Sequence, residues 1–250
     1  MKIKSCLYFL GLSCFPISIM SLINIFYSFY FDYLENVSSY VLALFLSLFV
    51  GLLFFYIGKK EREIISIYEQ LFLICLVYFL ISFFILVPFY FSDYSVSFIN
   101  SYFESISGLT GTGFTIFEHI KSLDDPLILW RSSSQWVGGL YFLIFLVLIF
   151  SNKQINFKII DLSFNLEQKI NFSSNLVSVT NRIFFIYLSL TALIFLIFLT
   201  SGIRLFDSLN LAMTIISSGG FLPTDSLNDI IRNNLQSILL CFTLDRKSVV

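Results

Sequence analysis

Five long apolar runs divide this chain and set the limits of what it can fold into. They cover residues 5–30, 38–57, 69–87, 126–150 and 183–200. A helix needs about 20 mainly apolar residues to cross a hydrocarbon layer of about 30 Å. Hydrophobic residues make up 57% of the 250 and charged residues only 12%, which is more apolar surface than a soluble fold can bury. The sequence therefore predicts an all-α polytopic membrane protein.

Two shorter apolar segments end in stretches of small residues. Residues 98–109 are too short to span a bilayer and lead into S-G-L-T-G-T-G-F at 107–114. Residues 205–216 lead in the same way into S-S-G-G-F at 217–221. Each segment predicts a re-entrant half-helix, because non-helical backbone at membrane depth is tolerated only where protein buries it or where it lines a water-filled path. Two such copies favour a transport site over a chance surface loop, which is the alternative interpretation of one copy alone.

The small residues of these stretches indicate what the site would bind. Glycine permits positive φ and close backbone approach, so carbonyl oxygens can face a common axis and replace the water shell of an ion. Aligning Gly113 with Gly219 sets residues 110–114 against 216–220. The pair Gly138 and Gly139, inside the run 126–150, has two explanations, which are close helix packing and a local bend.

A membrane enzyme and a transporter of another solute are the alternatives to an ion path. An enzyme would need ionisable side chains that converge within the spans, and His119, the sole histidine, falls in an outer loop. We therefore predict no enzyme activity. A secondary transporter of another cation or small solute would show a buried charged or polar clamp. That class and a non-conducting membrane subunit stay open, whereas the net charge of −1 argues against binding of nucleic acid.

Basic residues predict the orientation of the chain. With both small-residue stretches outside, nine basic residues lie on the cytoplasmic side and four outside, as the positive-inside rule requires. The cytoplasmic residues are Lys2, Lys4, Lys59, Lys60, Arg62, Lys153, Lys158, Lys169 and Arg182, and the outer ones are Lys121, Arg131, Arg204 and Arg232. Acidic residues on the outer face would form a negative vestibule that concentrates cations. Glu104 is the exception among them, because it falls within a half-helix.

Three motifs carry a resemblance to a known family. They are S-G-L-T-G-T-G-F at 107–114, L-W-R-S-S-S-Q-W-V-G-G at 129–139 and F-D-S-L-N-L-A-M-T-I-I-S-S-G-G-F at 206–221. They resemble the first two pore repeats of the Trk/Ktr/HKT potassium transporter superfamily, closest to the bacterial TrkH type, over about residues 68–242. The resemblance implies potassium-channel-like repeats of helix, pore half-helix and helix, preceded by two extra N-terminal transmembrane helices.

The same resemblance divides the chain and places the selectivity filter. It implies an N-terminal helix pair at 1–62, a first repeat at 63–151, a cytoplasmic connection at 152–181 and a truncated second repeat at 182–244, and we interpret the charged residues within 245–250 as a non-native scar. The filter residues matched to the family motif are Thr110, Gly111, Thr112, Gly113 and Phe114 in the first repeat and Ile216, Ser217, Ser218, Gly219 and Gly220 in the second.

The function implied is potassium uptake across the bacterial cytoplasmic (inner) membrane, with potassium as transported substrate and no covalently bound cofactor. For the full-length protein the resemblance implies a homodimer in membrane lipid and a cytoplasmic nucleotide-binding regulatory subunit of the TrkA type. Two departures stand out. Gly111 lies where threonine or another residue is commoner, and only two of the four expected repeats are present, so we expect a fragment of a longer reading frame.

Overall fold

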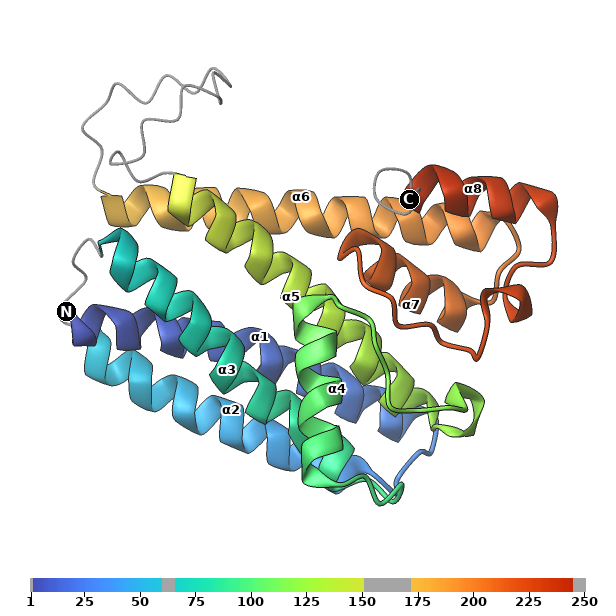
Figure 1. The fold of residues 1–250 in the computed structure, drawn as a ribbon, viewed down its shortest axis with the longest axis horizontal. Coiled ribbons are helices and arrows are strands. Elements are labelled where there is room, and N and C mark those ends of the chain that lie inside the picture. The colour runs from blue at the N-terminus through green and yellow to red at the C-terminus, as the bar shows by residue number, and fades with distance from the viewer. Residues whose placement is uncertain (1, 60–65, 151–171, 245–250) are drawn as a thin grey trace.

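The computed structural model describes residues 2–59, 66–150 and 172–244, and this part of the chain consists of helices joined by loops, with no strand (Figure 1). Its α-helices are α1 (Ile3–Tyr30), α2 (Val37–Gly58), α3 (Ile67–Tyr90), α4 (Phe98–Thr110), α5 (Asp125–Phe150), α6 (Phe172–Thr200), α7 (Leu205–Ile216) and α8 (Asn234–Leu244). Two short 3₁₀ helices, η1 (Ile120–Ser122) and η2 (Leu227–Asp229), lie in the connections that follow α4 and α7.

Five of these helices, α1, α2, α3, α5 and α6, are long and apolar enough to cross a membrane. They occupy the five predicted runs, so the all-α polytopic membrane fold is confirmed. One boundary differs, because α6 begins at Phe172 instead of near residue 183. Residues 172–181 of the predicted connection are therefore helical. The rest of that connection, 152–171, and the predicted scar at 245–250 lie outside the described residues.

Local sequence accounts for where α3 begins and where the half-helix α4 begins and ends. Ser66 opens α3 with a capping box, in which its hydroxyl accepts from the Glu69 N–H and its own N–H donates to the Glu69 carboxylate. Ser97 caps α4 by accepting from the N–H of Asn100 at 3.4 Å. Gly111 ends α4 in the left-handed conformation, with φ +70°, which only glycine adopts at little cost. The half-helix predicted at 98–109 thus begins and ends on sequence signals.

α5 is the central element of the fold. It packs against α1, α3, α4, α6 and α7, and Figure 1 shows it running diagonally between the α1–α3 group and the α6–α8 group. One hydrophobic core is built mainly by α1 to α5, and a second, around Phe198 and Leu211, by α6 to α8. Because α5 separates the two groups, side chains on its two faces reach both half-helices, α4 and α7.

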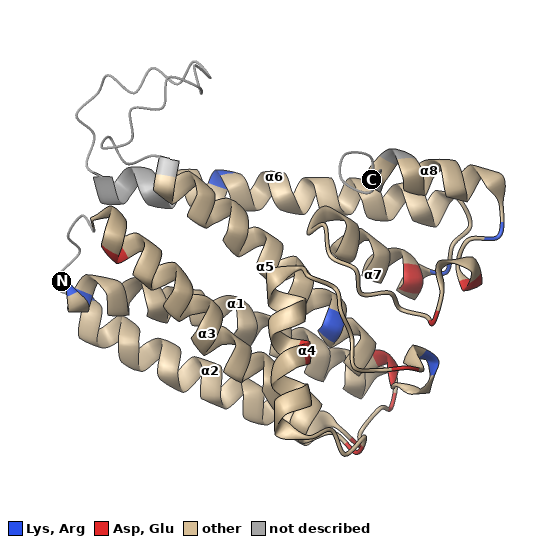
Figure 2. Ribbon diagram, viewed as in Figure 1, with Lys and Arg blue, Asp and Glu red and all other residues tan. Residues whose placement is uncertain are grey.

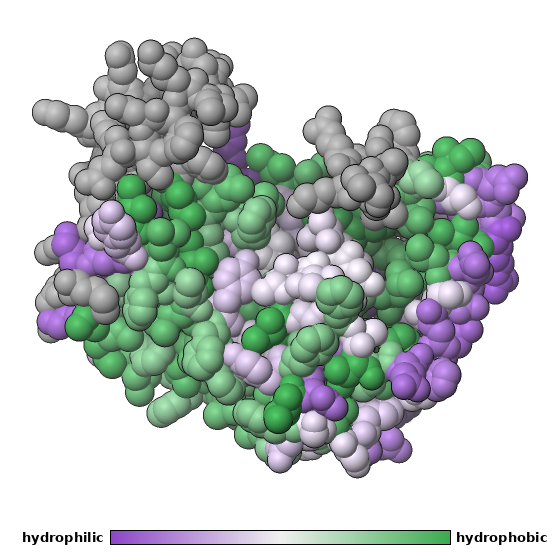
Figure 3. All heavy atoms as spheres, in the orientation of Figure 1, coloured by the Kyte–Doolittle hydropathy of each residue, from purple (hydrophilic) through white to green (hydrophobic). Residues whose placement is uncertain are grey.

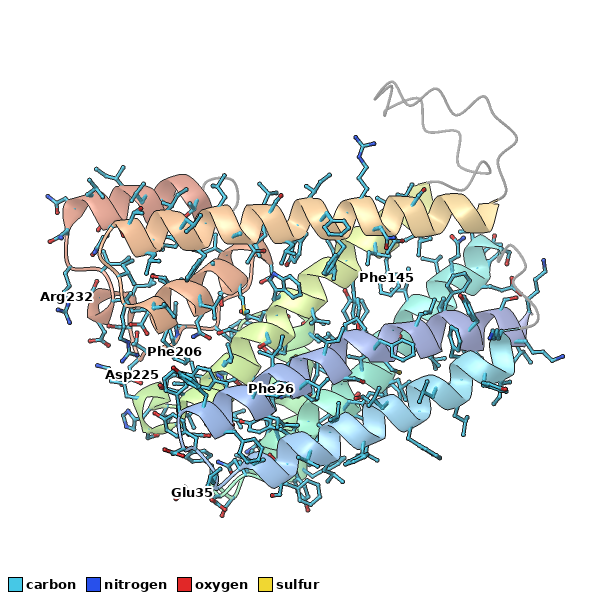
Figure 4. The ribbon with its side chains drawn as sticks, turned by 180° about the vertical axis from the view of Figure 1, so that it is seen from behind. Phe26, Glu35, Phe145, Phe206, Asp225 and Arg232 are labelled. Atoms are coloured by element: carbon cyan, nitrogen blue, oxygen red, sulfur yellow. The ribbon has the colours of Figure 1, made fainter. Side chains whose placement is uncertain are left out.

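Charges lie mainly at the two ends of the molecule. Figure 2 shows acidic residues gathered at the end that holds the loops after α4 and α7, and Figure 3 shows an apolar band between the hydrophilic ends. Glu35, Asp225 and Arg232 all lie at this acidic end (Figure 4). A multi-pass membrane protein is expected to show this distribution, since charged side chains avoid the hydrocarbon layer.

Candidate functional site

The first small-residue stretch folds back onto the half-helix that precedes it. The Thr112 N–H donates to the Ser107 carbonyl at 3.0 Å, and the Ser107 hydroxyl donates to the Phe114 carbonyl at 2.5 Å. Gly111 and Gly113 have φ of +70° and +80°, so both need the freedom of glycine. The Phe114 carbonyl is thereby turned toward α4, although sequence reasoning had placed Phe114 among the ion-binding residues.

The second stretch repeats this arrangement after α7. The Gly219 N–H donates to the Thr214 carbonyl at 2.9 Å, and the Thr214 hydroxyl donates to the Phe221 carbonyl at 2.9 Å. Ser218 takes the left-handed conformation here, with φ +54°, which costs a residue with a side chain more than glycine. The two repeats therefore share one hydrogen-bonding pattern at the end of their half-helices.

This shared pattern fixes which residues of the two repeats correspond. Ser107 corresponds to Thr214, Gly111 to Ser218, Thr112 to Gly219, Gly113 to Gly220 and Phe114 to Phe221. The alignment of Gly113 with Gly219 from sequence is thus wrong by one residue. The second stretch that matches 110–114 is 217–221, and Ile216 is the last residue of α7.

The corresponding glycines lie against each other. A methyl group built on Gly113 would lie 2.6 Å from the Cα and 2.7 Å from the N of Gly220, and one built on Gly220 would lie 3.1 Å from the Cα of Gly113. Real Cβ atoms avoid such distances, so the two stretches approach backbone to backbone. The structure thus brings together the two small-residue segments that were predicted from sequence.

Eight backbone carbonyls of the two stretches lack a hydrogen-bond donor among the described residues. Within the described part of the chain, no N–H or hydroxyl donates to the carbonyls of residues 110–113 or 217–220, whereas the carbonyls of Phe114 and Phe221 each accept a hydroxyl. Four of the eight residues are partly buried, where carbonyls are normally paired, and the other four are exposed, which are Thr110, Thr112, Ser218 and Gly220. These eight oxygens are therefore available to a ligand that can replace a donor.

The glycine pair of α5 contacts the ends of both half-helices. A methyl group on Gly138 would overlap the carbonyl of Leu109, the penultimate residue of α4. One on Gly139 would lie 2.8 Å from the Cβ of Ser217 and 2.6 Å from the hydroxyl of Tyr187 on α6. Close packing, one of the two explanations for this pair, is therefore confirmed, and it sets α5 directly against the candidate site.

A buried ion pair connects α4 to α5. The Arg131 Nε lies 2.9 Å from the Glu104 Oε1, and the two side chains are 1% and 0% exposed. The Glu104 carboxylate also accepts from the Thr115 hydroxyl at 3.0 Å and the Ile116 N–H at 2.9 Å, which holds the chain that follows the first stretch. Arg131 was expected in the outer group of basic residues, but it lies inside α5, where Glu104 compensates its charge.

Arg131 also reaches the second repeat. Its Nη1 donates to the Leu222 carbonyl at 3.4 Å, and its guanidinium lies 4.3 Å from the centre of the Phe221 ring. Leu211 occupies in α7 the position that Glu104 occupies in α4, and it is buried. A single buried cation in the first repeat thus supports the segments that follow both stretches.

Gln135, one turn after Arg131, contacts the second stretch directly. Its Oε1 accepts from the Phe221 N–H at 3.3 Å, and a methyl group on Gly219 would overlap its amide. The Gln135 side chain is fully buried. Sequence reasoning missed this residue, and the sole signal for it was its place in the motif at 129–139.

The loops after the two stretches are joined at the acidic end of the molecule. The Asp225 carboxylate accepts from the Ile120 N–H at 2.5 Å and the Lys121 N–H at 3.2 Å, and Lys121 Nζ lies 3.1 Å from Asp229. The hydrogen bond from Lys121 lowers the pKa of Asp229. We call these joined loops, 120–121 and 225–229, the rim of the site. The rim links the first repeat to the second, as the contact between Gly113 and Gly220 also does.

A half-open polar cavity of about 700 Å³ lies beside this rim. Three acidic and three basic residues line it, which are Asp125, Asp207, Asp229, Lys121, Arg204 and Arg232. Two ion pairs join them, Lys121 with Asp229 at 3.1 Å and Arg204 with Asp207 at 3.2 Å. The negative vestibule expected from sequence is thus partly neutralised here.

Similarity to known proteins was found in sequence and in structure. The chain is 31% identical over 134 residues to an uncharacterised cation transporter of Methanocaldococcus jannaschii, which covers 54% of the chain and 28% of that protein. It is 31% identical over 135 residues to the Trk system potassium uptake protein TrkI of Halomonas elongata, with 52% of the chain and 27% of that protein covered. No family model matches the chain.

The crystal structure of the potassium transporter TrkH from Vibrio parahaemolyticus superposes with a TM-score of 0.82 and 21% identity, over 97% of this chain. The chain has the fold of part of a Trk-type transporter. It spans 49% of that TrkH chain and less than a third of the two relatives above. In this Trk-type fold, α4 and α7 are the half-helices, and α1 and α2 precede the first repeat, as the resemblance implied.

Proposed function

We propose that this chain forms part of a pathway for potassium uptake, in which the free carbonyls of 110–113 and 217–220 bind the ion. The observation that carries the proposal is the absence, within the described residues, of any donor to these oxygens, on two stretches that lie backbone to backbone. A row of carbonyl oxygens can replace the hydration shell of a bare cation. The side chains at the site add hydroxyls and no net charge, which suits weak, reversible binding.

The names of the similar proteins support potassium as the ion. TrkI of Halomonas elongata and TrkH of Vibrio parahaemolyticus are potassium uptake proteins by name. The buried ion pair of Glu104 and Arg131 is neutral as a pair, and Glu104 accepts hydrogen bonds from Thr115 and Ile116, which directly follow the first stretch. Its part is to fix the backbone after each stretch, so that no covalent chemistry and no side-chain ligand is needed for transport.

The wider setting of the pathway belongs to this proposal as well. A closed ring of carbonyls needs oxygens on every side of its axis, and this chain supplies two segments. We therefore expect further repeats to complete the ring, with a homodimer and a nucleotide-binding TrkA-type subunit on the cytoplasmic side of a bacterial inner membrane. The divisions at 62, 151, 181 and 244 remain predictions of that arrangement.

The proposal is tested by rubidium uptake in cells that lack their own potassium uptake systems. The chain would be expressed from the longest natural reading frame that contains it, with its amount in the membrane measured. We expect saturable rubidium uptake that potassium inhibits, and loss of uptake in Gly113→Val, where a branched side chain meets Gly220. Gly202→Val is the matched control, because Gly202 also has positive φ, at +89°, but has no atom within 4 Å of an added Cβ. Uptake that potassium does not inhibit would contradict the proposal.

A further inference from the structure

Gln135 belongs to the first repeat by sequence, yet its side-chain amide contacts the second repeat. Its two neighbours on α5 contact other helices. Ser134 packs against Gly108 of α4, and the Trp136 indole N–H donates a hydrogen bond to the Thr191 hydroxyl of α6. The Gln135 Oε1 accepts the Phe221 N–H at 3.3 Å, and its amide fills the space beside Gly219 where any side chain would lie. The residue therefore contacts the backbone of the second stretch at two points, Gly219 and Phe221.

Two hydrogen bonds hold Phe221 from opposite sides. The Phe221 N–H donates to Gln135, and the Phe221 carbonyl accepts the hydroxyl of Thr214 on α7. Thr214 anchors the stretch to its own half-helix, whereas Gln135 anchors it to the helix of the other repeat. With both ends of this residue fixed, the preceding carbonyls at 217–220 have little freedom to move along or away from the ion path.

The chemistry of Gln135 is not that of a packing residue. Within the described part of the chain, its buried Nε2 has no hydrogen-bond partner, while its Oε1 has one. A buried amide with an unsatisfied donor is costly, and an apolar side chain of similar volume would avoid that cost. Among the described residues, the hydrogen bond to the second stretch is the one contact of Gln135 that requires the amide.

We propose that Gln135 is a positioning residue that fixes the backbone of 217–221 from the neighbouring repeat and thereby sets the preference for potassium over sodium. The inference rests on the proposed function, because the preference is that of the carbonyls at 217–220. When the amide is lost, the Phe221 N–H has no acceptor and the stretch relaxes. Carbonyls that can draw closer together then bind the smaller sodium ion better than before.

The test compares Gln135→Met with Val137→Ala in the longest natural reading frame. Methionine keeps the length of the side chain and removes the acceptor, whereas Val137 lies on the same helix in the hydrophobic core built mainly by α1 to α5, and its truncation leaves a cavity there. The sodium concentration that halves rubidium uptake, corrected for the amount of protein, should fall about tenfold in Gln135→Met, the equivalent of one buried hydrogen bond. It should stay unchanged in Val137→Ala, even if less of that protein accumulates.

Hydrogen exchange of the purified protein gives a second readout that does not depend on transport. Amides of 217–222 should exchange faster in Gln135→Met than in the unaltered protein, and at the unaltered rate in Val137→Ala. Gln135→Glu keeps an acceptor oxygen for Phe221 and should retain slow exchange, which covers the case in which the methionine variant fails to fold.

Unchanged exchange and unchanged sodium sensitivity in Gln135→Met would overturn the inference while leaving potassium uptake in place. Absent rubidium uptake by the unaltered protein would instead remove the proposed function, and exchange alone would then decide whether Gln135 positions the stretch.

Discussion

Glu104 of α4 and Arg131 of α5 form an ion pair of 2.9 Å in which neither side chain is more than 1% exposed. The pair also holds two further segments, since Glu104 accepts from the Ile116 N–H after the first stretch and Arg131 donates to the Leu222 carbonyl after the second. A charge at this depth is tolerated because its partner lies beside it, and it becomes costly when that partner is removed.

Removing one partner of this pair should destabilise the protein more than removing both. Arg131→Leu leaves Glu104 buried and unpaired, and we expect a loss of about 3–5 kcal/mol in the free energy of unfolding. The double variant Glu104→Leu, Arg131→Leu should recover part of that loss, since no buried charge remains. Denaturant unfolding of the purified protein in detergent measures both. A double variant that is less stable than either single variant would show that the pair is not the main contribution of these residues.

Gly113→Ser should reduce discrimination against sodium by about tenfold, the equivalent of about 1.4 kcal/mol. The serine must take a φ near +80° and place its Cβ against the backbone of Gly220, so the two stretches must separate. Because Gly113 and Gly220 correspond, Gly220→Ser should have an effect of the same direction. Rubidium uptake in competition with sodium measures it, with Gly202→Ser as the control for positive φ alone. Equal selectivity in all three variants would remove these glycines from the ion path.

Single cysteines placed in the loop after α1 and the loop after α4 should be labelled from outside the cell. The expectation rests on the basic residues counted in the sequence, nine cytoplasmic against four outer, and the burial of Arg131 inside α5 leaves three of those four at the outer face. Cysteines at Glu35 and Glu118, both exposed, should react with an impermeant maleimide in intact cells, and one at the exposed Lys59 should react only after lysis. The exposed native thiols Cys75 and Cys241 would first be replaced by serine. Labelling at position 59 in intact cells would reverse the orientation.

Acid should release the tether between Lys121 and Asp229. The hydrogen bond from Lys121 lowers the pKa of Asp229, so the contact stabilises the fold above the ordinary aspartate value of about 3.9 and is lost as the pH falls through the lowered value. Lys121→Met should therefore lower the Tm relative to the unaltered protein at about pH 6, and the difference should vanish well below about pH 3.9. A difference that grows on acidification would contradict this sign.

The 250-residue chain expressed alone should not restore growth at low potassium. Phe114, the last residue of the first stretch, is 69% exposed, and the carbonyls at 110–113 and 217–220 have no donor within the described residues. Facing lipid, each unsatisfied group costs on the order of several kcal/mol. Growth of uptake-deficient cells at low potassium, with the chain shown in the membrane, is the measurement. Restored growth would mean that two repeats can complete the path, for instance as a dimer.

The helices were predictable from the sequence, and the contacts between the repeats largely were not. Hydropathy and length placed the long helices, and the short runs before the glycines placed α4 and α7 within one residue. The alignment erred because Gly219 and Gly220 look equivalent in sequence, and the hydrogen bonds of Ser107 and Thr214 were needed to distinguish them. The phenylalanine that closes each stretch, Phe114 and Phe221, was the available signal.

Buried charge was the other limit of sequence reasoning. Arg131 lies near the start of an apolar run, where a lone sequence cannot tell a residue that faces water from one paired inside. Glu104, an acid within a half-helix, was noted as exceptional but had no visible partner, because 27 positions of chain separate the two. Such pairs become apparent only when the packing of the glycine pair in α5 brings that helix against α4.

The place of α5 between the two half-helices has a consequence for how such repeats can be rearranged. Arg131 and Gln135 are encoded in the first repeat and act on the backbone of the second, at Leu222 and Phe221. The two units are consequently not interchangeable parts. A permuted gene in which the second repeat comes before the first would preserve every helix in the sequence, but it would assemble correctly only if α5 still docked against α7 without the connection that now leads from one to the other.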